Sequence, residues 1–261
     1  MVSSIVDILV LSALAGLATG LGGFVAIVGK PGRKTLGFLL GSAAGIMITL
    51  SFLKLLAEAW RISGLYLAAS GFVTGSLLMF TLDFLLPHRF FSVYERGMAD
   101  RRGTRRRRRI RGRARFLKSS MLIAVGISLH NFPEGIAVAS GYSYLPRLGL
   151  VIAIAMALHN IPEGMAISLP AYIGGASKSS AVRLALISGL AEPLGAIVAS
   201  LLLEISLSLV PFGLSLASGV MVFVTLDELI PVAHEGGHEH FTPLGVIMGC
   251  AATFILLGAL S

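Results

Sequence analysis

The segment LHNFPEGIAVAS, residues 129–140, places ionisable side chains inside an apolar run, and it returns as LHNIPEGMAISL at residues 158–169. The two copies supply His130, Asn131, Glu134, His159, Asn160 and Glu163. Imidazole nitrogen with carboxylate oxygen is a ligand set that suits Zn²⁺, and it is also acceptable to Fe²⁺ or Mn²⁺. The repeated segment therefore predicts a site for a divalent transition metal.

The spacing within each copy is helical. Four residues separate each histidine from its glutamate, which puts both on one helix face, and the asparagine flanks that face. Pro133 and Pro162 stand within the two copies. A proline removes one amide donor and crowds a carbonyl of the preceding turn, so we expect both helices to kink there.

A simpler interpretation is that these residues are satisfied polar packing, with one histidine–glutamate hydrogen bond in each helix fixing the register between helices. Two copies at matched depth, each with a proline, favour a functional site, because ionisable groups at mid-membrane usually mark an ion or substrate route. Glu192 in AEPLG repeats the Glu-Pro pair in a later apolar stretch and supplies a third candidate carboxylate.

The composition of the whole chain is that of a membrane protein. Of its 261 residues, 55% are hydrophobic and 13% are charged, where a soluble domain carries about 25% charged residues. Eight apolar stretches are long enough to cross a hydrocarbon core of about 30 Å as helices. We expect these spans at 5–28, 36–56, 65–86, 119–141, 149–171, 183–206, 212–233 and 243–260. The predicted fold is an all-α polytopic membrane protein with a single transmembrane domain over residues 1–261.

Consecutive spans run in opposite directions, which relates the two motifs by symmetry. The fourth and fifth spans would be related by a pseudo-two-fold axis that lies in the membrane plane. This inverted pseudo-symmetry brings the ligands of both copies together at mid-membrane, where transporters commonly hold their substrate.

The basic residues of the connections predict the orientation. Lys30, Arg33 and Lys34 follow the first span, and Lys178 and Arg183 follow the fifth. Under the positive-inside rule these connections face the cytoplasm, so we expect both termini outside.

The connection between the third and fourth spans, residues 87–118, contains the run RRGTRRRRRIRGRAR. We expect a basic cytoplasmic loop that is disordered in part and leans on anionic lipid headgroups. The run has no interleaved aromatic residues, so nucleic acid is not an expected partner.

Cys250 is the single cysteine, which excludes an intramolecular disulfide and a thiolate metal cluster.

The hexapeptides HNFPEG and HNIPEG on adjacent spans, followed by AEPLG, resemble the ZIP family of divalent metal transporters, closest to its prokaryotic members. The resemblance covers essentially the whole chain: eight spans, both ends outside, and a long cytoplasmic loop after the third span. It implies uptake of Zn²⁺ or a related ion, such as Fe²⁺, Mn²⁺ or Cd²⁺, into the cytoplasm through a two-metal site at mid-membrane.

Carried over motif by motif, the resemblance assigns ligands to two metal positions. The first would use His130, Glu134, His159 and Glu163, and the second would use Asn131, Glu134, Asn160, Glu163 and Glu192, with both motif glutamates bridging. Met47 lies in a segment similar to the family's second helix, where a methionine can complete the first position; packing is the alternative role for it. Lys54 stands where many relatives carry a histidine, which weakens the case for a metal-collecting role at the outer mouth.

Further polar residues lie toward the inner ends of the third and seventh spans. These are Asp83, Asp227, Glu228 and His234. Both spans run inward, so we interpret the four residues as an exit route of weak, hydrated ion sites below the central site. The alternative is a polar helix end.

We therefore expect a multi-pass transporter in the cell membrane, with divalent metal ions and the lipid bilayer as partners. We expect no enzymatic activity and no catalytic cofactor, and we leave a homodimer open. The alternative function is an intramembrane metal-dependent hydrolase, in which one glutamate acts as base toward a metal-bound water. An enzyme site needs an open coordination position and a passage for substrate, whereas a symmetrically repeated ligand set favours transport.

Overall fold

The computed structural model describes residues 2–85, 105–236 and 240–260, and in these ranges the chain is helical with no strand. The elements in chain order are α1 (Val2–Gly29), α2 (Arg33–Leu50), η1 (Ser51–Leu56), α3 (Ala57–Ser63), α4 (Leu65–Leu85), α6 (Arg105–Tyr144), α7 (Pro146–Ile173), α8 (Lys178–Gly189), α9 (Ala191–Ile205), η2 (Leu207–Leu209), α10 (Val210–Val224), η3 (Thr225–Leu229), α11 (Ile230–Gly236) and α12 (Phe241–Ala259).

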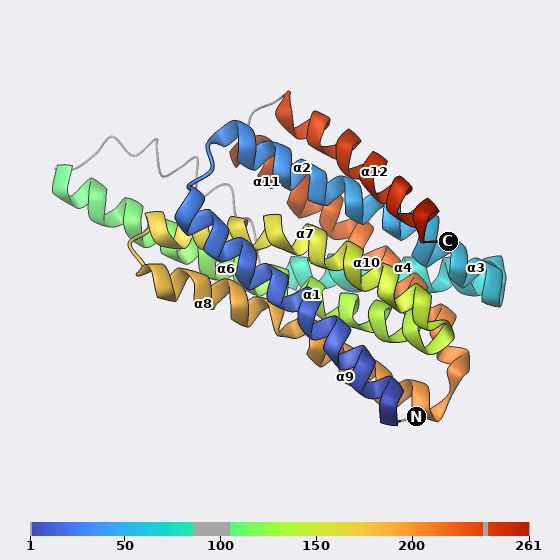
Figure 1. Cartoon of the computed structure of the whole chain (residues 1–261). Coiled ribbons are helices and arrows are strands. Elements are labelled where there is room, and N and C mark those ends of the chain that lie inside the picture. The colour runs from blue at the N-terminus through green and yellow to red at the C-terminus, as the bar shows by residue number, and fades with distance from the viewer. Residues whose placement is uncertain (1, 86–104, 237–239, 261) are drawn as a thin grey trace.

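Eight helical segments of the described chain are long and apolar enough to cross a membrane, which confirms the predicted all-α membrane fold. The second span joins α2, η1 and α3, the sixth joins α8 and α9, and the seventh runs from η2 to α11. Both termini lie at the same end of the bundle (Figure 1), as an even number of spans requires.

Two expectations concern the helices that carry the motifs. Pro133 and Pro162 lie inside α6 and α7, and both helices continue past them. The kinks and the inverted pseudo-symmetry stay predictions. Of the expected basic loop, residues 105–118 form the first turns of α6, and residues 86–104 lie outside the described chain.

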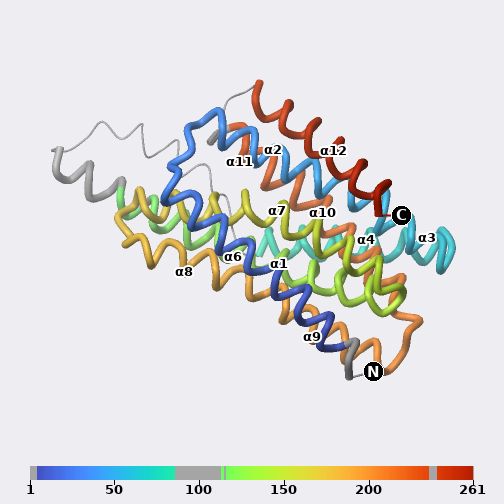
Figure 2. Tube along the Cα trace, in the orientation of Figure 1, coloured from blue at the N-terminus to red at the C-terminus, as the bar shows by residue number. Residues whose placement is uncertain are grey.

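The helices that carry the motifs are central in the packing. α6 lies against α7 and α9, while α7 also lies against α1 and α2. α12 packs on α2 at one edge of the bundle (Figures 1 and 2). α4 packs on α10. In the span of α7, 72% of the most apolar window is buried, against 22% for α4 and for α12. The motif residues are therefore shielded from lipid on all sides by other helices.

Glycine lets the central helices approach closely. A Cβ built on Gly22 of α1 would collide with the backbone carbonyl of Ile161 in α7, and one built on Gly164 of α7 would collide with the carbonyl of Thr19 in α1. Small residues at such contacts are typical of membrane helices, whose association depends on close van der Waals packing.

We expect Gly22→Ala to destabilise the protein, because the added methyl group must push α1 away from α7. Overpacking of this kind costs about 1–3 kcal/mol. The matched control is Gly29→Ala, near the end of the same helix, where an added Cβ meets no atom within 4 Å. Thermal unfolding in detergent should show a lower midpoint for Gly22→Ala and an unchanged midpoint for Gly29→Ala. Equal midpoints would contradict the close α1–α7 contact.

Candidate metal centre

The two motif copies face one another across the antiparallel pair α6 and α7. Leu145 is the single residue between these helices, so residues equally far from it lie at similar depth. His130 and Glu134 on α6, and His159 and Glu163 on α7, are each no more than 2% exposed. His130 and His159 are 15 and 14 residues from Leu145, so the fold buries the two copies at overlapping levels of the bundle.

The histidine and glutamate side chains pair between helices. His130 Nε2 lies 3.3 Å from Glu163 Oε2, and His159 Nε2 lies 3.0 Å from Glu134 Oε1. The packing alternative assumed a hydrogen bond within each helix, and the structure instead exchanges the partners. Each imidazole therefore joins the carboxylate of the other motif, and the two copies form one cluster.

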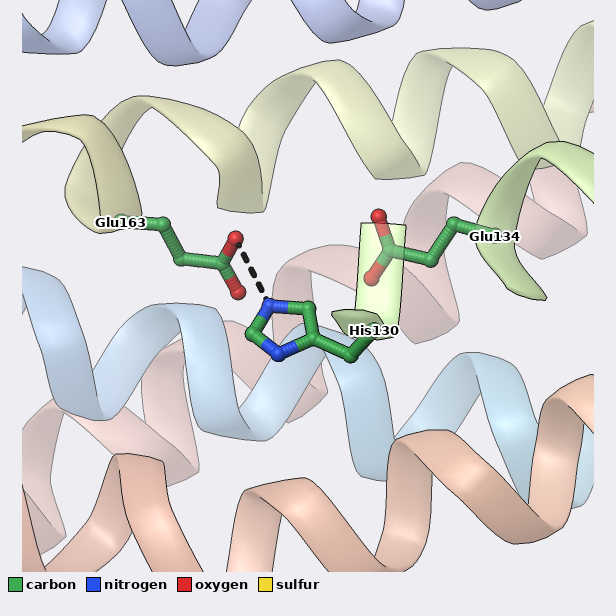
Figure 3. A group of neighbouring side chains, drawn as sticks. All are labelled: His130, Glu134 and Glu163. Carbon is green, nitrogen blue, oxygen red and sulfur yellow. Dashed lines mark hydrogen bonds and ion pairs between the residues drawn. The ribbon is translucent and has the colours of Figure 1, made fainter. Parts of the chain in front are cut away.

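Three of these residues converge tightly enough to hold one ion. One ligand atom from each of His130, Glu134 and Glu163 lies within 4.8 Å of the other two. Figure 3 shows the two carboxyl groups pointing toward one another from opposite sides, with the imidazole of His130 beside them. Nitrogen and oxygen donors in this combination suit Zn²⁺ and other divalent transition metals.

The asparagine side chains of both motifs donate hydrogen bonds through their amide nitrogens to acceptors on other helices. Asn160 Nδ2 donates to the carbonyl of Ala15 and to Glu192 Oε2, each at 2.9 Å. Asn131 Nδ2 donates to the carbonyl of Ser188 at 3.3 Å. Because each nitrogen faces an acceptor, each amide oxygen is left as the group available to a cation.

Several buried oxygens of the cluster have no hydrogen-bond donor. These atoms are Asn131 Oδ1, Glu134 Oε2, Asn160 Oδ1, Glu163 Oε1 and Glu192 Oε1. A buried polar group without a partner costs about 1–3 kcal/mol, and more if it is charged. All five are carboxyl or amide oxygens, a ligand type that divalent cations accept from proteins, so a cation bound among them would meet several of these atoms.

Glycines of the motifs bring the third carboxylate into place. Gly135 follows Glu134, and a Cβ there would collide with the backbone carbonyl of Glu192. Gly195 in turn meets the carbonyl of Phe132. α6 and α9 therefore touch backbone to backbone at the level of the site, which delivers the buried Glu192 side chain to Asn160.

Met47 is fully buried in α2, and its sulfur accepts a hydrogen bond from Thr225 Oγ1 at 3.5 Å. Its role as a metal ligand stays a prediction.

Lys54, in the same span, forms an ion pair, because its Nζ lies 3.2 Å from Glu58 Oε1. Glu58 Oε2 also pairs with Arg61 at 2.8 Å. Lys54 therefore shares the carboxylate of Glu58 with Arg61, so one negative charge faces two positive charges.

Of the residues predicted for an exit route, the structure places one beside the cluster. Glu228 lines a small cavity of about 30 Å³ together with His130 and Glu163, and its Oε1 has no hydrogen-bond partner. Asp83 is half-buried, whereas Asp227 and His234 are exposed. The sequence put Glu228 below the site, but it gave no sign that this residue, in the π-helical turn η3, shares a cavity with His130.

The sequence is similar to a family model and to several proteins of known name. The family model described as ZIP Zinc transporter matches residues 100–257. The zinc transporter ZupT of Akkermansia muciniphila is 39% identical, over 97% of this chain and 97% of that protein. The ZupT proteins of Corynebacterium efficiens and Escherichia fergusonii are 38% and 39% identical, and the alignments cover 98% and 92% of this chain and 97% and 92% of those proteins.

We expect zinc binding to displace a proton from the pair His159 and Glu134. His159 Nδ1 lies 3.0 Å from the carbonyl oxygen of Ala155, which can only accept, so Nδ1 donates. The contact between Nε2 and Glu134 then needs a second proton, carried by the imidazole or by the carboxyl group. A metal bound to both side chains takes the place of that proton.

The measurement is a Zn²⁺ titration of purified protein in weakly buffered detergent solution. Proton release should be about one per ion from this pair over roughly pH 6 to 8. The substitution Glu204→Gln, at an exposed position of α9, should leave the release unchanged, whereas Glu134→Gln should reduce it. Zinc binding without any proton release would contradict the hydrogen-bond assignment.

Proposed function

Because this chain belongs to the ZIP family of zinc transporters, we propose that it moves divalent transition metal ions across the cell membrane through a two-metal site. The family and the names of the relatives indicate divalent metal transport. The observation that supports a site for more than one ion is the set of five orphaned oxygens, which is larger than one ion beside His130 needs.

In the proposed site, the two motif glutamates bridge the ions. The first ion is held by His130, Glu134, His159 and Glu163, with Met47 as a further ligand. The second ion is held by Asn131, Glu134, Asn160, Glu163 and Glu192. The orphaned atoms support this division, because each glutamate has one oxygen at an imidazole and the other without a partner. A carboxylate in that state has an oxygen for each position.

Zn²⁺ is the proposed principal substrate, and Fe²⁺, Mn²⁺ and Cd²⁺ are candidates as well. Imidazole favours zinc among these ions, and the absence of cysteine from the site leaves a weaker centre from which an ion can depart. The ZupT relatives of the three organisms carry names that specify zinc, which supports the same choice.

The proposed direction is into the cytoplasm, with both termini outside. The end of the bundle that carries Lys30, Arg33 and Lys178 would be cytoplasmic under the positive-inside rule. Glu228 would then receive the ion on its inward side, because it shares a cavity with His130 and Glu163. Asp83, Asp227 and His234 would follow as weak sites. The hydrolase alternative has no observation in its favour, since the family is one of transporters.

We expect Glu134→Ala and Glu163→Ala each to abolish zinc uptake into proteoliposomes, because each removes a bridging ligand from both metal positions. Uptake should fall to the level of protein-free vesicles. Glu204→Ala is the matched control, since it removes a carboxylate at an exposed position of the same bundle. Uptake at the wild-type rate in either site variant would contradict the two-metal assignment.

We expect Glu228→Gln to slow zinc uptake while leaving zinc affinity of the central site nearly unchanged. The amide fills the same space but cannot offer a carboxylate to the departing ion. Uptake rate and equilibrium binding should be measured on the same preparation, with Glu204→Gln as control. If both quantities stay at wild-type values, Glu228 has no part in the route.

A further inference from the structure

A second, larger cavity lies at the basic end of the bundle, which we define as the end that holds the α1–α2 turn and the first turns of α6. Its volume is about 470 Å³. Its walls are formed by apolar side chains of α2, α6 and α7, among them Leu36, Leu40, Ile123, Met165, Leu169 and Ile173. A cavity of this character suits hydrocarbon better than a hydrated ion.

The rim of this cavity is positively charged. Lys30 and Arg33 lie on it, and none of the described residues that line the cavity carries a carboxylate. Three candidate spans begin or end at the rim, at Arg33, Phe116 and Ile173. The rim is therefore at the depth where lipid headgroups lie, and the walls reach toward the hydrocarbon layer.

The backbone of Lys30 is unusual. Its φ is +45°, a left-handed conformation that a helix C-terminus normally assigns to glycine. The neighbouring Gly29 and Gly32 take ordinary φ values, since the glycines with positive φ are Gly64 and Gly175. A lysine in this strained conformation at the rim is a second indication that its charge makes a functional contact there.

We propose that this cavity binds one anionic phospholipid of the adjoining leaflet. One acyl chain fills the apolar interior, and the phosphate lies at Lys30 and Arg33. Basic residues at a membrane surface attract anionic lipids, and the cavity gives the hydrocarbon chain an apolar site at the matching depth. The binding does not depend on the proposed transport function.

The position of the cavity gives a bound lipid a consequence. Ile123, Ala166 and Val232 line both this cavity and the small cavity beside His130 and Glu228. An acyl chain would therefore lie between the candidate metal centre and the basic end of the bundle. Lipid occupancy would limit the space through which the centre communicates with that end.

Native mass spectrometry of the full chain in detergent tests the proposal. The probes are phosphatidylglycerol, phosphatidylcholine with the same acyl chains, and inorganic phosphate. We expect one phosphatidylglycerol to be retained per protein. Phosphatidylcholine should bind at least about fivefold more weakly, because a basic residue at an anionic surface contributes roughly 1 kcal/mol, which corresponds to that factor. Inorganic phosphate should not displace the lipid.

Variants separate the charged rim from the apolar interior. Lys30→Gly removes the charge at a φ that favours glycine, so it should keep the fold and weaken phosphatidylglycerol binding by about fivefold. Lys30→Arg should restore the binding. Leu169→Trp, or Ser119→Leu from the opposite wall, should abolish retention by filling the cavity. Lys178→Gln at the same end and Leu194→Trp on the exposed face of α9 are the controls and should bind as the wild type does.

Three results would overturn the proposal. Equal retention of the two lipids, unchanged by Lys30→Gly, would mean that lipid binds only to the general surface. Wild-type retention by both cavity-filling variants would mean that the acyl chain lies elsewhere. Displacement of phosphatidylglycerol by inorganic phosphate would leave an anion site at the rim and no lipid site.

Discussion

The rest of the molecule depends on compensating the burial of five ionisable side chains among apolar helices. Each is no more than 2% exposed; they are His130, Glu134, His159, Glu163 and Glu192. A buried charge without a partner costs several kcal/mol. The antiparallel pair of α6 and α7 meets part of this need, because each imidazole lies against the carboxylate of the other helix. The acceptors that remain unmatched are the oxygens that the proposed metal site would use.

The helices around the cluster are also in close backbone contact. A side chain at the contact points would collide with the carbonyl of the facing helix. Gly135 and Gly195 allow α6 and α9 to touch, and Gly22 and Gly164 do so for α1 and α7. Each glycine of the two motifs therefore contributes to packing, while the glutamate before it contributes a buried carboxylate to the cluster.

Polar groups outside the cluster differ in how far they are compensated. At one end of the second span, Glu58 is paired with Lys54 and Arg61, so its charge is balanced by neighbours. Glu228, by contrast, lies next to His130 with an oxygen that has no donor. This chain belongs to the ZIP family, and the uncompensated oxygens are the atoms on which the proposed metal site rests.

The amino-acid sequence by itself determined the eight spans and the buried positions of the motif residues, and it predicts a divalent transition metal as their ligand. These properties depend on hydropathy over about 20 residues and on the helical repeat, which are local. Only the tertiary structure decided that His130 pairs with Glu163 instead of Glu134, that Asn160 turns its amide nitrogen toward Glu192, and that Glu228 lies beside the first histidine. A spacing of four residues specifies a shared helix face but not the partner across it. That partner depends on the register and distance between antiparallel helices, which glycine contacts far apart in the chain set together.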